Sequence, residues 1–127
     1  MAETVADASV LIDQLSGVRS AALIEAAAKG ELILPPLVVA ELITGAGTIE
    51  LRREIGELLQ ESELHPTPLQ HWIDVGLLRF RLAHSGLNVT IPDAHVAQCA
   101  LDRNAVLLSR DEIFAKIAKH VPLRVSA

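Results

Sequence analysis

Aromatic side chains are nearly absent from this sequence of 127 residues, which contains one Trp, two Phe and no Tyr. Proteins that bind single-stranded nucleic acid by stacking bases depend on several aromatic side chains, so a protein of that class is not expected. Apolar runs are short as well, and none approaches the ~18 residues that indicate a membrane-spanning helix. Near the N-terminus, Glu3 and Asp7 stand where a secretory signal peptide would carry basic residues. We therefore expect neither a membrane span nor a signal peptide.

Cysteine occurs only once, as Cys99, in an Ala-rich stretch with a helical pattern. A single cysteine excludes an intrachain disulfide and is typical of a protein kept in the reducing cytosol. We expect Cys99 to be a small buried side chain and the protein to be cytoplasmic.

Positive charge is also in short supply, because 11 Lys and Arg face 16 Asp and Glu, for a net charge of -5. Proteins that bind nucleic acid are usually basic. A bound divalent cation would offset part of the negative charge, and a partner chain could supply basic groups, so the charge alone does not exclude an RNA substrate. The cationic side chains that could still form a basic patch are Arg52, Arg53, Arg79, Arg81, Arg103, Arg110, Lys116 and Lys119.

Half of the residues (50%) are hydrophobic, and the length suits a single domain over residues 1–127. Short apolar runs typical of strands covered on both faces alternate with stretches whose apolar residues recur at helical spacing. This alternation predicts an α/β fold, a three-layer α/β/α sandwich with a mainly parallel central sheet. Strands are expected at residues 4–6, 32–34, 63–65, 105–108 and 121–125, the last at a sheet edge because of its proline, and helices at 20–29, 37–44, 48–61, 69–86, 92–104 and 111–119.

One predicted helix, residues 48–61, carries more apolar residues on one face than a small core needs: Leu51, Ile55, Leu58 and Leu59. Two uses are open for this face. It could form a homodimer interface or a groove for a partner protein, or it could simply pack in the core. We expect core packing.

Four acidic residues stand at positions that a buried sheet would not tolerate without a reason. Asp7 ends the first predicted strand, and Asp111 follows the predicted strand 105–108. Glu41 is the only acid in an otherwise apolar helix, and Asp93 follows Pro92 in the first turn of another. Taken one at a time, each has an ordinary explanation as a turn residue, a cap, a first-turn acid or an exposed side chain on a helix edge.

Taken together, the four acids would repel one another at the strand ends, and no Lys or Arg occupies a matching position to neutralise them. A divalent cation would resolve the conflict. Ligands that are all oxygen favour Mg²⁺ or Mn²⁺, which are commonly held by a few carboxylates and several waters. The sequence therefore predicts a cation site formed by Asp7, Asp93 and Asp111, with Glu41 as a ligand through water or as a base for an attacking water.

Several polar residues accompany these acids. Ser9 is expected to cap the helix that follows Asp7, and both Ser9 and Ser109 are candidates to hydrogen-bond a ligand carboxylate or a substrate phosphate. Asp13 is expected to be an ordinary solvated acid of that helix. Ser109 and Arg110 precede Asp111, where Arg110 could contact a phosphate or be solvated. His95 lies two residues after Asp93 and would point away from it on a helix, so we do not expect it to be a ligand.

The four motifs, in this order and spacing, resemble the PIN-domain superfamily, and within it the VapC-type toxins of toxin–antitoxin pairs. The motifs are Asp7-Ala8-Ser9-Val10-Leu11-Ile12-Asp13, Pro36-Leu37-Val38-Val39-Ala40-Glu41-Leu42, Pro92-Asp93-Ala94-His95-Val96-Ala97-Gln98-Cys99-Ala100 and Leu107-Leu108-Ser109-Arg110-Asp111-Glu112-Ile113-Phe114. The resemblance implies a metal-dependent RNase fold whose acidic positions match Asp7, Glu41, Asp93 and Asp111, with hydroxyl positions matching Ser9 and Ser109. It also implies a VapB-like antitoxin as partner. We expect a homodimer as well.

The sequence departs from the family pattern in two places. Many relatives carry a further Asp two residues after the last acid, where this chain has Ile113, and this puts a second metal ion in doubt. His95 and Gln98 replace residues that are usually small or apolar.

Two other functions remain open. Ile113 is compatible with an inert module of the same fold that only docks a partner. A phosphotransferase with Asp7 as nucleophile is the second, although that class usually has a second acid where this chain has Ser9.

Overall fold

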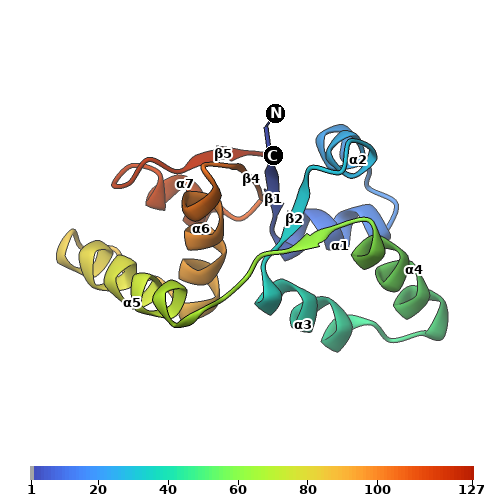
Figure 1. Cartoon of the computed structure of the whole chain (residues 1–127), viewed down its shortest axis with the longest axis horizontal. Coiled ribbons are helices and arrows are strands. Elements are labelled where there is room, and N and C mark those ends of the chain that lie inside the picture. Colours follow the sequence, from blue (N-terminus) through green and yellow to red (C-terminus); the bar gives the residue numbers. More distant parts are fainter. Residues whose placement is uncertain (1) are drawn as a thin grey trace.

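Five short strands form one parallel sheet in the computed structural model, which describes residues 2–127 (Figure 1). They follow the order β3-β2-β1-β4-β5, so the first strand of the chain lies in the middle. The strands are β1 (Thr4–Ala6), β2 (Leu32–Leu34), β3 (Glu63–Leu64), β4 (Val106–Leu108) and β5 (Arg124–Ser126). The five predicted strands are present. β3 is one residue shorter than expected, and β5 is displaced from the predicted 121–125 to Arg124–Ser126, without Pro122, although it lies at an edge as expected.

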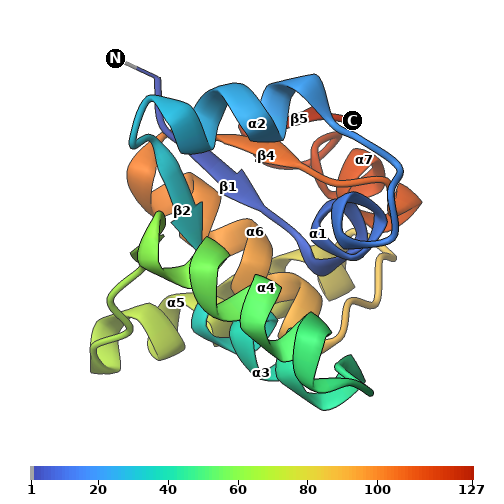
Figure 2. The ribbon, with the colours of Figure 1, turned by 90° about the vertical axis from the view of Figure 1, so that its right-hand side faces the viewer.

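Seven helices surround the sheet within residues 2–127: α1 (Ala8–Leu15), α2 (Ala21–Ala28), α3 (Pro36–Gly45), α4 (Ile49–Gln60), α5 (Leu69–His84), α6 (Ile91–Arg103) and α7 (Glu112–Ile117). Helix α2 packs on β1 and β2, and α6 packs on β1 and β4 from the opposite face (Figure 2). This arrangement confirms the three-layer α/β/α sandwich.

The central strands are buried on both faces. Val5 pairs in register with Ile33 of β2 and Leu107 of β4, and each of these side chains is 1% exposed or less. Such burial explains the unbroken apolar runs in the sequence, because a strand covered on both faces has no polar side. Cys99 of α6 is completely buried in the same core, as predicted.

The helix α4 face that could have served an interface packs mainly in the core. Ile55 is buried, and Leu51, Leu58 and Leu59 are half-buried against the core. Core packing of this face is therefore confirmed.

In helix α5, by contrast, many apolar side chains are exposed. Its buried side is formed by His71, Val75, Leu78 and Leu82, whereas the apolar residues that signal the helix in the sequence lie largely in solvent. The exposed ones are Leu69, Trp72, Ile73, Leu77 and Phe80.

Across residues 2–127, the structure contains no helix with the length and apolar character required to cross a membrane.

Candidate functional site

The carboxyl ends of β1 and β4 lie side by side, and they position two of the four acids. Asp7 directly follows β1, and its backbone N–H still donates to the carbonyl of Leu108 in β4 (3.0 Å). Asp111 follows β4 and begins α7, while Glu41 comes from α3 and Asp93 from the first turn of α6. Because these parallel strands end at the same sheet edge, residues 102 positions apart in the chain meet there.

Two serine hydroxyls hold the Asp7 carboxylate. Ser109 Oγ donates to Asp7 Oδ2 at 2.8 Å and Ser9 Oγ donates to the same oxygen at 3.1 Å. Each hydroxyl also accepts from the backbone of the β4–α7 connection, Ser109 from the N–H of Asp111 and Ser9 from the N–H of Arg110. Asp7 is buried, at 8% exposure, and hydrogen bonds from both chain segments fix the orientation of its carboxylate.

The prediction that Ser9 caps α1 is wrong. The helix begins at Ala8, Asp7 occupies the N-cap position, and no side chain there accepts a capping hydrogen bond. Ser9 therefore lies within the first turn, where its hydroxyl donates to Asp7 and stabilises the site instead of the helix end.

Two of the four carboxyl groups, Glu41 and Asp93, have raised pKa values. Burial raises the pKa of Glu41, and the negative charges of Asp7 and Asp93 raise it further. Burial also raises the pKa of Asp93; a hydrogen bond with Thr90 opposes this, and the charges of Asp111 and Asp7 add to it. Among the ion pairs of residues 2–127, none involves these four side chains. The acids thus repel one another without a protein counter-ion, as the sequence predicts.

The oxygens of these carboxylates suit a hard divalent cation, but the carboxylates are too far apart to enclose one ion without water. A closed metal site needs at least three ligand atoms close to one another. Within residues 2–127, three His, Cys, Asp or Glu side chains have such atoms within 4.8 Å of one another at one place, and these are His65, His71 and Cys99, not the acids. The acids thus stand farther apart than a set of ligands closed on one ion. This arrangement fits Mg²⁺ or Mn²⁺, which retain several waters and need only one or two direct carboxylates.

Arg110 and Asp13 form an ion pair that the sequence analysis missed. The guanidinium donates from Nη1 to Asp13 Oδ2, which joins the β4–α7 connection to α1. Asp13 is therefore a paired side chain and not simply a solvated acid. Arg110 lies beside the acids, and its cationic group is held by Asp13 and not inserted among them.

Asp111 also has the local role that its sequence position suggests. It is the N-cap of α7, and its Oδ1 accepts from the backbone N–H of Ile113 at 3.1 Å. Ile113, which replaces the further acid of many relatives, is half-buried and packs against the core.

A second polar cluster lies inside the molecule and was not predicted. His65, His71 and His95 are buried and connected through Asp102, and none of them contacts the four acids in the described hydrogen bonds. His95 hydrogen-bonds to His71 and to the backbone N–H of Leu37 instead of to the acids. The sequence signal was the spacing of His95, Cys99 and Asp102, which places all three on one face of α6.

Comparison with known proteins identifies the family of this chain. The chain matches the PIN domain family over residues 4–120. No curated protein matches it. Among solved structures, it resembles a chain of VapBC2 from Rickettsia felis bound to a promoter DNA fragment, with a TM-score of 0.78, 16% identity and coverage of 97% of this chain and 96% of that chain.

Two further structures are similar. A chain of VapBC-1 from nontypeable Haemophilus influenzae has a TM-score of 0.76 and 20% identity, covering 97% of this chain and 96% of that one. A chain of VapBC-5 from Mycobacterium tuberculosis has a TM-score of 0.69 and 24% identity, with 98% of each covered. The family match extends from β1 through α7 and includes all four acids, and these structures share the fold along nearly their whole length. The chain belongs to the PIN domain family.

Proposed function

We propose that the protein is a metal-dependent endoribonuclease of the VapC type, the toxin of a toxin–antitoxin pair, which hydrolyses RNA phosphodiester bonds. The observation that carries this proposal is the group of four carboxylates at the ends of β1 and β4, two of which have raised pKa values without a cationic partner. The family membership and the structural similarity to VapBC complexes support it.

Asp7, Asp93 and Asp111 would hold Mg²⁺ or Mn²⁺, directly or through water. When bound, a divalent cation lowers the pKa of its water and neutralises charge on the phosphate oxygens. Ser9 and Ser109 keep the carboxylate of Asp7 in one orientation, so this ligand needs little reorganisation.

Glu41 is the proposed proton acceptor. Its pKa is raised by burial and by the charges of Asp7 and Asp93, and a carboxylate with a raised pKa accepts a proton from water more readily. Arg110 stands at the rim, where an RNA phosphate can compete with Asp13 for its guanidinium. A substrate held this way would bind through its backbone, which agrees with the scarcity of aromatic side chains.

A VapB-like antitoxin is the proposed protein partner. A cavity of about 190 Å³ lies between α1, α3 and α4, and Glu41 lines it together with the apolar side chains of Ile12, Leu42 and Leu51. An antitoxin segment could place an apolar side chain in this cavity and a basic one toward the acids. Co-purification with the product of the adjacent gene, followed by loss of binding in Ile12→Asp, would test this, because Ile12 lines the cavity and is 50% exposed.

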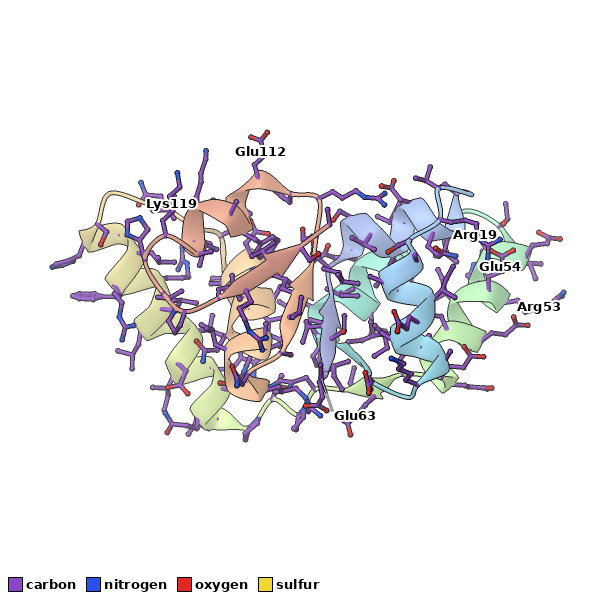
Figure 3. The ribbon with its side chains drawn as sticks, turned by 90° about the horizontal axis from the view of Figure 1, so that it is seen from above. Arg19, Arg53, Glu54, Glu63, Glu112 and Lys119 are labelled. Atoms are coloured by element: carbon purple, nitrogen blue, oxygen red, sulfur yellow. The ribbon has the colours of Figure 1, made fainter. Side chains whose placement is uncertain are left out.

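Purified Asp93→Asn is the decisive variant for the activity. It keeps the size of the side chain and removes one ionised ligand, so we expect Mg²⁺- or Mn²⁺-dependent RNA cleavage to fall by at least about a hundredfold. The matched control is Glu112→Gln, since Glu112 is an exposed acid beside Asp111 whose side chain points away from the molecule (Figure 3). Equal cleavage by the parent and Asp93→Asn would refute the proposed activity.

An inert module that only docks a partner remains the alternative, because Ile113 packs on the core at the position where many relatives carry a further acid. Calorimetry separates the two functions. The nuclease requires Mn²⁺ binding that Asp93→Asn weakens, whereas the inert module predicts no measurable binding by either protein.

A further inference from the structure

A continuous chain of hydrogen-bonded polar side chains, buried at its three histidines and exposed at Asp102, connects β3, α5, α6 and the start of α3. His65 follows β3, His71 belongs to α5, and His95 and Asp102 belong to α6. The three histidines are 5%, 3% and 0% exposed, respectively. No side-chain nitrogen or oxygen buried in the described structure lacks a hydrogen-bond partner, so this chain is a complete network.

The hydrogen bonds of this network permit only one assignment of donors and acceptors. Asp102 Oδ2 can only accept when ionised, and it lies 3.0 Å from His71 Nδ1 and 3.2 Å from His65 Nε2. His71 therefore donates from Nδ1 and has only Nε2 left to accept, from His95 Nδ1 at 2.8 Å. His95 must then accept at Nε2, and the backbone N–H of Leu37 donates to that atom at 3.4 Å.

Each of these histidines thus has one nitrogen that donates and one that accepts. Burial raises the pKa of Asp102, but hydrogen bonds from His71, Gln98 and His65 outweigh that effect and keep its pKa below the ordinary value. An ionised Asp102 at one end therefore sets the tautomer of every ring that follows.

The other end of the network is a helix terminus with no cap of its own. Pro35 occupies the N-cap position of α3 and Pro36 its first turn, so neither offers a capping side chain. Leu37 has the first N–H of this helix, and such a group needs an acceptor. His95 supplies that acceptor from α6, and the ring of Trp72 stacks on it with centroids 4.9 Å apart and planes 10° apart.

The two helices joined in this way carry two of the four acids, Glu41 on α3 and Asp93 on α6. We propose that Asp102 and His71 are positioning residues that hold His95 as the Nδ1–H tautomer, and that His95 thereby fixes the start of α3 against α6 and sets the separation of Glu41 and Asp93. This role rests on the proposed function, since it concerns the geometry of the same cation site. Asp102, His71 and His95 act through the helices and do not touch the substrate.

The first test is independent of activity. Long-range ¹⁵N–¹H correlation spectra of the uniformly labelled protein at neutral pH report the tautomer of each histidine ring. We expect the Nδ1–H form for His71 and His95 and the Nε2–H form for His65. Nε2–H forms of His71 and His95, or rapid exchange between tautomers, would overturn the proposal.

The second test compares His71→Phe with Val75→Ala. Phenylalanine keeps a ring in α5 but cannot connect Asp102 to His95, whereas Val75→Ala creates a cavity in the same buried face of α5 and leaves the network intact. We expect Mn²⁺ affinity, measured by calorimetry, to fall about fivefold in His71→Phe, as for the loss of one neutral hydrogen bond. Val75→Ala should bind Mn²⁺ as the parent does, even where its melting temperature falls as far.

A conservative replacement supplies the rescue. In Asp102→Asn, the amide oxygen can still accept from His71 and His65, so the tautomers and the Mn²⁺ affinity should be retained. Asp102→Ala removes the acceptor and should behave as His71→Phe does. In RNA cleavage, kcat should fall in His71→Phe and Asp102→Ala, while KM for RNA should not change.

These outcomes distinguish two failures. If the parent binds Mn²⁺ and Asp93→Asn does not, but His71→Phe and Val75→Ala bind equally well, the positioning role fails and the cation site stands. If the parent binds no Mn²⁺ at all, the proposed function fails, and the positioning role falls with it even where the spectra show the expected tautomers.

Discussion

Single hydroxyl groups at this site act on the carboxylates instead of on helix ends. Ser109 donates to Asp7 while accepting from the N–H of Asp111, so one oxygen joins the two acids that end β1 and begin α7. A ligand held this way is oriented before a cation arrives, which lowers the cost of binding.

Ser109→Ala removes three contacts of this oxygen, with Asp7, with the N–H of Asp111 and with the hydroxyl of Ser9 at 3.3 Å. We expect Mn²⁺ affinity to fall roughly five- to tenfold and unfolding to become easier by about 1 kcal/mol, the usual contribution of such a hydrogen bond. Calorimetry and urea denaturation measure the two effects. Ser85→Ala is the control, because Ser85 is an exposed residue at the end of α5 with only a long hydrogen bond of 3.5 Å to the Arg81 carbonyl. An unchanged Mn²⁺ affinity in Ser109→Ala would contradict the orienting role.

The raised pKa of Glu41 determines how the metal-free protein responds to pH. A carboxyl whose pKa is higher in the folded state binds more protons there, so its contribution favours folding at low pH and is lost as pH rises through the folded pKa. In EDTA at pH 7, Glu41→Gln should therefore melt at a higher temperature than the parent, and this difference should shrink toward pH 4. The affinity of the parent for Mn²⁺ should weaken as pH falls, and this weakening should begin at a pH above the ordinary pKa range of carboxyl groups.

Glu54→Gln is the control for this experiment. Glu54 is exposed on α4, and its side chain points outward at the side of the molecule (Figure 3). The melting temperature of Glu54→Gln should therefore equal that of the parent at every pH. A Glu41→Gln variant that melts below the parent in EDTA at pH 7 would show that repulsion among the acids does not cost stability.

At the residue scale, the sequence pointed to the four acids and to two serine hydroxyls beside them, but not to the ion pair and the histidine network in the folded structure. Asp7 and Asp111 could be placed because each follows an apolar run that only a buried strand explains. The pairing of Arg110 with Asp13 could not, because it depends on how the β4–α7 connection passes α1. The histidine network was hidden for the same reason, since its members come from β3, α5 and α6.

At the scale of elements, helix α6 has both ends defined by side chains or backbone. Thr90 accepts from the N–H of Asp93 at its start, and Asn104 ends it in the left-handed conformation with φ of 50°. The cap at Thr90 also fixes the turn that carries Asp93, so its effect extends from helix stability to the cation site.

Thr90→Ala should destabilise the protein by about 1 kcal/mol, which corresponds to a lower melting temperature by several degrees. It should also weaken Mn²⁺ binding, because the first turn of α6 loses its fixed position. Thr48→Ala removes the equivalent cap of α4, where Thr48 accepts from the N–H of Leu51. That control should show a similar loss of stability with unchanged Mn²⁺ affinity. Equal Mn²⁺ affinities in Thr90→Ala and Thr48→Ala would show that the cap at Thr90 has no effect on the cation site.

The order and type of the elements could be predicted because Pro36, Thr48 and Pro92 mark helix starts and the short apolar runs mark buried strands. Which face of α5 is buried could not be predicted. The polar His71 is inside because Asp102 and His95 satisfy it, and the larger apolar side chains are outside.

At the scale of the whole molecule, the exposed stripe on α5 is a candidate surface for the expected homodimer. Leu69, Ile73, Leu77 and Phe80 recur every three or four residues and are 76%, 45%, 59% and 57% exposed. Apolar side chains grouped along one helix indicate an interface more strongly than scattered ones do.

Leu77→Lys combined with Phe80→Lys should convert a dimer to a monomer in light scattering, because two charges would be buried without partners. Leu64→Lys is the control, since Leu64 is 56% exposed on β3, away from α5. A parent protein that is monomeric at high concentration, or a double variant that remains dimeric, would exclude this surface.

The sheet order has a consequence for synthesis. Because β1 needs β4 as its neighbour, and Asp7 needs a hydroxyl located 102 positions later, neither is complete until β4 and Ser109 have left the ribosome. For the proposed ribonuclease, a nascent chain that ends before β4 would also lack Asp111 and could not cleave the RNA of the ribosome that makes it. The late synthesis of β4 would then delay the proposed activity until these residues have been made.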